Sequence, residues 1–173
     1  MAGPSLKLGM LQECASGELV KVRINESVEW ALVGGRGQGV SWLVVLSGPK
    51  AFTAINMAPQ GHIDGDFERY PVIRFGEAYT FAPNQRAACQ IANGDLFSKP
   101  GSLVVSEKGS CLVVRSENNK SMMRYVDLAF GVVGGEPGGQ RAAFAAWTLY
   151  DDTTPPHEAR DVLIQHKEHV PGG

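Results

Sequence analysis

Short segments rich in β-branched and aromatic residues, separated by frequent glycines and prolines, dominate this sequence. The 173 residues include 21 Gly and 10 Pro, a share above the usual one, which implies many turns. Residues 18–25 alternate, with apolar side chains such as Val22 on one side and basic ones such as Arg23 on the other. We therefore predict a single all-β domain over residues 1–173. It is an antiparallel sandwich or barrel, with a jelly-roll-like arrangement among the alternatives, and has one or two short helices.

Two further segments give specific strand predictions. Residues 40–46 are apolar almost throughout, so we predict a central strand covered on both faces. Residues 102–106 and 111–116 flank a short turn, in which Gly109 supplies the positive φ that a tight hairpin needs. Shorter candidate strands are residues 28–32, 52–57, 72–75 and 78–81. From these patterns we expect seven core side chains: Trp42, Val44, Leu46, Val104, Val113, Phe130 and Trp147.

The remaining segments are assigned by the same reasoning. Residues 123–133 and 141–150 both alternate, which predicts a long hairpin with a mobile tip at the glycine-rich residues 134–139. Residues 84–92 suit a short turn of helix. Near the C-terminus, Ala159, Val162, Leu163 and His166 fall at helical spacing after Pro155 and Pro156, so an amphipathic helix is favoured. The alternation of Val162, Ile164 and His166 keeps a last strand as the alternative.

Charge and cysteine content narrow the class of protein. Lys and Arg total 16 against 18 for Asp and Glu, a net charge of −2, so we expect no nucleic-acid partner. The sequence shows no export signal and no apolar run long enough for a bilayer, so we expect no membrane partner. Cys14, Cys89 and Cys111 are odd in number and in no CxxC pair, which indicates reduced thiols and a cytoplasmic protein.

The glycine-rich residues 34–39 form the first candidate site. Their spacing does not match the dinucleotide or nucleotide phosphate-binding motifs, and they are predicted to join two strands, whereas those motifs open a helix. A flexible hairpin loop is therefore the simplest interpretation. Arg36 and Gln38 at its tip are our candidate ligand-binding residues.

Acidic and histidine residues give a candidate metal site. His62, Asp64, Asp66 and Glu68 recur at every second position, which places four possible ligands on one side of an extended segment. The oxygen-rich set suits Mn, Mg, Fe(II) or Ca, and a solvated acidic loop is the competing interpretation. His157, His166 and His169 are interpreted as a polar terminal face.

One segment resembles a known family. Residues 93–105, with Gly94, Asp95, Pro100 and Gly101, resemble part of the second conserved motif of the cupins. The resemblance implies a jelly-roll-like sandwich. It does not extend to cupin metal chemistry, because the histidine expected after this motif and a preceding His-x-His are both missing.

Two functions remain open from the sequence. The first is a non-catalytic binding or assembly module without a cofactor, whose loops 34–39 and 134–139 meet a protein partner or a small ligand. The alternative is a metal-dependent, cupin-like β-barrel enzyme that uses His62, Asp64 and Asp66. The many small residues in residues 142–146, Ala145 among them, also predict self-association as a homodimer, and cover of this face by the C-terminal segment of the same chain is the alternative.

Overall fold

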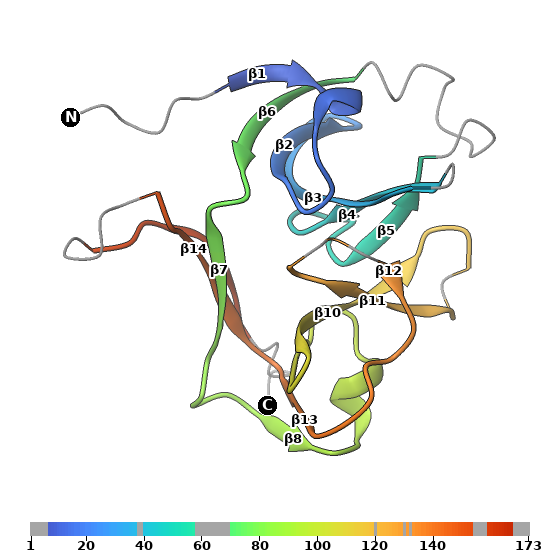
Figure 1. Ribbon diagram of the computed structural model, residues 1–173, viewed down its shortest axis with the longest axis vertical. Coiled ribbons are helices and arrows are strands. Elements are labelled where there is room, and N and C mark those ends of the chain that lie inside the picture. Colours follow the sequence, from blue (N-terminus) through green and yellow to red (C-terminus); the bar gives the residue numbers. More distant parts are fainter. Residues whose placement is uncertain are drawn as a thin grey trace.

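The protein is an open sandwich of two β-sheets and not a closed barrel (Figure 1). The computed structural model describes residues 7–37, 40–57, 70–119, 121–129, 131, 133–153 and 159–167. Among these residues the only helical elements are two short 3-10 turns, η1 (Leu11–Glu13) and η3 (Asp95–Ser98). No described helix has the length and apolar character needed to cross a bilayer. The expected all-β class is confirmed.

The larger sheet contains twelve strands. Its main path runs in the order β1 (Lys7–Met10), β6 (Pro71–Gly76), β2 (Leu19–Ile24), β3 (Ser27–Gly37), β4 (Val40–Val45), β5 (Thr53–Asn56), β10 (Gly109–Ser116), β9 (Leu103–Ser106), β13 (Arg141–Phe144) and β8 (Cys89–Ile91). β11 (Met123–Asp127) pairs with β10, and β12 (Val133–Gly134) pairs with β11. Neighbouring strands are antiparallel except β5 and β10, whose parallel contact joins the two halves of the sheet.

The smaller sheet has three strands in the order β15 (Val162–His166), β14 (Trp147–Asp151) and β7 (Tyr79–Pro83). β7 and β14 run side by side, apart from strands β2 to β5 (Figure 1). The chain therefore leaves the larger sheet after β6, contributes β7 to the smaller sheet, and returns with β8.

The two faces of β2 to β5 contribute to two separate cores, as the side-chain alternation requires. On one face Val20, Val33 and Leu43 pack with Leu11 of η1 and Val72 of β6. The opposite face of the same strands meets β9, β10, β11 and β14 in a second core around Trp147. The indole Nε1 of Trp147 donates a 2.7 Å hydrogen bond to the Gly101 carbonyl, so its polar atom is satisfied inside the core.

Several strand predictions are confirmed. Residues 19–24 and 40–45 form β2 and the central β4, and the predicted tight hairpin is β9–β10, where Gly109 has φ +131°. Five of the expected core side chains are buried: Val44, Leu46, Val104, Val113 and Trp147. Trp42 is only half-buried, with the Arg124 guanidinium 5.9 Å from its ring centroid. Phe130 lies outside the described residues.

The predicted long hairpin is wrong. β11 pairs with β10 and β12, β13 pairs with β9 and β8, and β14 belongs to the smaller sheet. Alternation identifies a strand but not its neighbour: β11 pairs with the strands next to it in sequence, whereas β13 and β14 pair with strands made much earlier in the chain. The structure confirms the strands and corrects their partners.

Both predicted helices are also wrong where the structure describes them. Residues 84–92 form a turn followed by the edge strand β8. Residues 162–166 form β15, which pairs Leu149 with Ile164, so the alternation is the correct pattern there. The backbone hydrogen bonds available along β14 outweigh the weak helical spacing of a short segment.

Candidate functional site

The end of β12 and the glycine-rich segment that follows it line one side of a pocket of about 350 Å³. Gly134, Gly135 and Pro137 provide this wall, and Cys111, Tyr125 and Asp127 provide the floor. We call it the glycine-walled pocket. The floor residues share one face of β10 and β11, because Cys111 is the register partner of Asp127 and Tyr125 follows at the alternate position.

Glycine at the wall keeps this pocket open. Gly134 is the register partner of Tyr125, so a side chain at this position would lie on the same face as the tyrosine ring. A Cβ added to Gly134 or Gly135 would have no atom within 4 Å, and neither residue has a positive φ. The space exists because side chains are absent, and not because the backbone requires glycine there.

Arg141 holds the wall in place. Its Nη2 lies 2.7 Å from Oε1 of Glu136, and its Nη1 donates to the carbonyl of Pro137. Its Nε donates to the Ala92 carbonyl at 3.2 Å, and its guanidinium carbon lies 4.8 Å from the centroid of the Phe97 ring. The Arg141 side chain therefore connects residues 136–137 to Ala92, the residue that directly follows β8.

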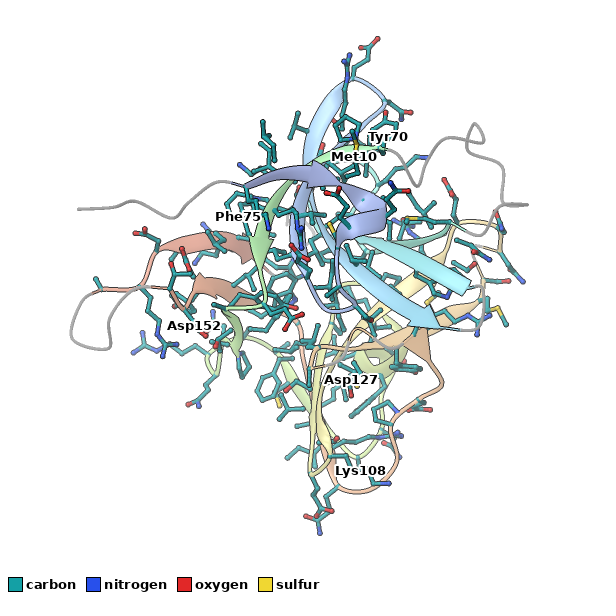
Figure 2. All side chains as sticks on the ribbon, turned by 45° about the horizontal axis from the view of Figure 1, so that its top comes forward. Met10, Tyr70, Phe75, Lys108, Asp127 and Asp152 are labelled. Atoms are coloured by element: carbon teal, nitrogen blue, oxygen red, sulfur yellow. The ribbon has the colours of Figure 1, made fainter. Side chains whose placement is uncertain are left out.

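The ionisable groups of the floor have structural partners. Burial, reinforced by the nearby Asp127 carboxylate, raises the pKa of Cys111 to about 11, so this residue is a neutral thiol at physiological pH. Burial also raises the pKa of Tyr125, and its hydroxyl donates to the Phe97 carbonyl at 2.7 Å. Asp127 accepts from the Ala129 amide at 2.8 Å. Lys108 is exposed at the rim, at the tip of the β9–β10 hairpin (Figure 2).

The candidates from the first glycine-rich loop are only partly described. Arg36 lies in β3, near the end of the β3–β4 hairpin, and its side chain is outside the described part of the structure. Gln38 lies outside the described residues. The expected hairpin connection is confirmed, while the ligand-binding role of both residues stays a prediction.

The candidate metal ligands His62, Asp64, Asp66 and Glu68 all lie outside the described residues. Among the residues that are described, no group of three His, Cys, Asp or Glu side chains is arranged to hold a metal ion. The metal site stays a prediction from the sequence.

His166 is not part of a polar terminal face. It lies on β15, half-buried, with its ring centroid 4.7 Å from that of Phe52 and 5.4 Å from that of Trp147. Burial and the nearby charge of Lys99 lower its pKa. The other two histidines of that expected face, His157 and His169, lie outside the described residues.

The cupin-like segment departs from the family pattern in its geometry. Gly94 and Asp95 lead into the 3-10 turn η3, and β9 begins only after Pro100 and Gly101, so no strand separates the two pairs of motif residues. Gly101, at φ +92°, packs closely against Phe52, because a Cβ there would lie 2.7 Å from that ring. These glycines serve a turn and a close packing contact.

The wall of the glycine-walled pocket was predicted from the sequence as a loop, whereas the residues of its floor were not predicted to lie together. The available signal was the presence of Cys111 in one predicted strand and of Tyr125 and Asp127 at alternate positions in another. The pairing that brings them together was not predicted. Comparisons of the chain with protein-family models, with curated proteins and with solved structures found no match, so no family is assigned.

Proposed function

We propose that the protein is a non-catalytic binding module that holds a small, largely apolar ligand in the glycine-walled pocket. The observation that carries the proposal is the open space beside Gly134, above the ring of Tyr125 and the thiol of Cys111. A volume of about 350 Å³ lies within the range of small-molecule sites. Gly134, Gly135 and Pro137 place no polar side chain on the wall, which suits an apolar ligand.

The chemistry of the floor supports binding and not catalysis. A nucleophilic cysteine needs a lowered pKa, whereas that of Cys111 is raised to about 11. The Tyr125 hydroxyl is already a hydrogen-bond donor to a backbone carbonyl, so it is occupied in holding η3 to β11. The other sequence-based function, a metal-dependent enzyme, and an assembly role with a protein partner remain predictions.

Filling the pocket tests the proposal. The probe is 1-anilinonaphthalene-8-sulfonate, an apolar dye with one anionic group, titrated into the full chain and followed by fluorescence. Gly134→Leu should abolish its saturable enhancement, because the new side chain occupies the space beside Tyr125. Gly138→Leu is the matched control, since Gly138 also faces open space but does not line the pocket.

Circular dichroism melts of both variants show whether each remains folded. Wild-type protein that gives no saturable enhancement would contradict the proposal. So would a Gly134→Leu variant that binds the dye as the Gly138→Leu variant does.

A further inference from the structure

A second pocket, of about 370 Å³, lies where the two halves of the larger sheet join. It is lined by the turn before β5 and by the end of β10, with Lys50, Thr53, Arg115 and Glu117 among its residues. β5 and β10 meet near the middle of the molecule (Figure 1). We call it the junction pocket. It is separate from the glycine-walled pocket, with which it shares no lining residue.

The parallel contact fixes the positions of its side chains. Thr53 and Arg115 are register partners, so their side chains lie on the same face of the sheet. The amide of Arg115 donates to the Phe52 carbonyl at 2.9 Å, and the amide of Glu117 donates to the Ala54 carbonyl at 3.0 Å. Residues distant in sequence are therefore held at one place by backbone hydrogen bonds.

The turn that carries Lys50 is held by an unusual backbone conformation. Phe52 has φ +61°, a left-handed conformation that costs free energy for a residue with a Cβ. Its ring packs edge-on against Trp147 and His166 at centroid distances of 6.1 Å and 4.7 Å, and this burial offsets the strain. Phe52 thus anchors the end of the turn, directly before β5, to Trp147 and His166.

Donors outnumber acceptors among the side chains of the junction pocket. Lys50 Nζ lies 2.9 Å from Oε1 of Glu117, and both side chains are substantially exposed. Arg115 is half-buried and makes no ion pair within the described part of the chain. Thr53 is 7% exposed, and no described protein group forms a hydrogen bond with its hydroxyl. The Thr53 hydroxyl and the Arg115 guanidinium both line the pocket and are accessible from it, so they are donors that an anion entering the pocket can use.

We propose that the junction pocket binds a phosphate group, either inorganic phosphate or the phosphate of a small molecule. Arg115 and Lys50 supply two positive charges for a doubly charged anion, and the Thr53 hydroxyl donates a hydrogen bond from the face it shares with Arg115. The three donors come from a turn and two strands, and the planar fork of arginine matches the oxygens of a phosphate group. Glu117 competes with the anion for Lys50 and so limits the affinity.

The test measures binding of inorganic phosphate to the full chain by isothermal titration calorimetry at low ionic strength. Arg115→Gln should weaken binding about tenfold or more, because a charge-assisted hydrogen bond is lost. Glu117→Gln should strengthen binding, because Lys50 is released and a repulsive charge removed. Arg86→Gln is the control: it removes the same charge from an exposed turn and should change the affinity by less than about twofold.

Thr53→Val guards against the case in which Arg115→Gln does not fold, since it removes only the hydroxyl. It should weaken phosphate binding severalfold without lowering the melting temperature. Absence of phosphate binding by the wild type would overturn the proposal, as would equal losses in Arg115→Gln and Arg86→Gln. Weaker binding by Glu117→Gln would also overturn it, and acetate that binds more tightly than phosphate would overturn the choice of anion.

Discussion

Replacing Arg74 by methionine would leave a carboxylate buried without its partner. Glu18 is 4% exposed, and its two oxygens accept from Arg74 Nε at 2.6 Å, from Arg74 Nη2 at 2.9 Å and from the Ala15 amide at 2.9 Å. Arg74→Met removes two of these three hydrogen bonds and, among the described residues, the only side chain that forms an ion pair with Glu18. Breaking a buried pair in this way costs about 3–5 kcal/mol.

That cost is large for a domain of this size, because folded proteins are stable by only about 5–15 kcal/mol. The double variant Glu18→Leu with Arg74→Met removes both charges and leaves apolar side chains beside the first core. Its unfolding free energy should be within about 1–2 kcal/mol of the wild-type value, because no charge is then buried alone. The difference in unfolding free energy between the single and double variants therefore measures the cost of leaving the Glu18 carboxylate without its partner.

The same reasoning predicts a pH dependence with a definite sign. Burial favours the neutral form of Glu18, but the hydrogen bonds from Arg74 and Ala15 and the charge of Arg74 outweigh it, so its pKa is lowered from 4.5. In the wild type the Glu18–Arg74 pair therefore contributes its full stabilisation above the unperturbed pKa of 4.5, and this contribution is lost as the pH falls through the lowered pKa of the folded state. In Arg74→Met burial acts without the guanidinium, so the carboxyl accepts a proton more readily and the penalty shrinks on acidification.

Urea unfolding followed by tryptophan fluorescence measures both effects. The wild type, the single variant and the double variant are compared at neutral pH and at about pH 5, where protonation of a carboxyl with a raised pKa becomes favourable. A loss below about 1 kcal/mol for Arg74→Met at neutral pH would refute the buried-pair reasoning. If Arg74→Met loses as much unfolding free energy at about pH 5 as at neutral pH, the argument that burial makes Glu18 easier to protonate in this variant is refuted.

Four further measurements test the structure and the sequence-based predictions. Thiol titration of the unfolded, unreduced protein should find three thiols, and in the folded protein exposed Cys89 should react first, half-buried Cys111 more slowly and buried Cys14 only on unfolding. Ala145→Glu should unfold the chain, because Ala145 is 4% exposed in a core with Phe97, and a charge there has no partner; a stably folded variant would contradict this placement. Self-association stays a prediction, checked by sedimentation against the monomer mass. Elemental analysis checks the metal-dependent alternative, which stoichiometric Fe, Mn or Zn would support.

The sequence predicts the strands of this fold better than their neighbours. Alternation in β2 and the apolar run of β4 depend on local burial, which the residues themselves encode, and the β9–β10 hairpin depends on one glycine in its turn. The long hairpin failed because β13 and β14 belong to different sheets, although only two residues separate them. Alternation shows which side chains of a strand share a face, but it does not show which strand pairs with which. The pairing of strands distant in sequence could therefore not be predicted.

The alanines behind the expected dimer show the same limit. Ala143, Ala145 and Ala146 are buried within the chain, and the first two pack in a core with Leu96 and Phe97 of η3. The small side chains correctly indicated that another element packs closely against this strand. For Ala143 and Ala145 that element is the 3-10 turn η3 of the same chain.

The two pockets were predictable to different degrees. The wall of the glycine-walled pocket was visible as a glycine-rich loop, while its floor required the β11–β12 pairing of Tyr125 with Gly134. The junction pocket was not visible at all, because Thr53 and Arg115 meet only through a parallel contact between segments far apart in sequence. Long-range contacts of this kind leave no local periodicity.

The separation of β7 from β14 has a consequence for how the chain folds during translation. Every buried member of the first core lies between Leu11 and Val72, so that core is complete in sequence before β7 is made. β7 pairs only with β14 among the described residues, and β14 follows the whole of β8 to β13. During synthesis β7, with Tyr79 and Phe81, is therefore made well before β14, and until then neither of its edges has a native partner strand. Unpaired edges are sites of intermolecular pairing, so substitutions that weaken β14 should lower yield through aggregation during synthesis.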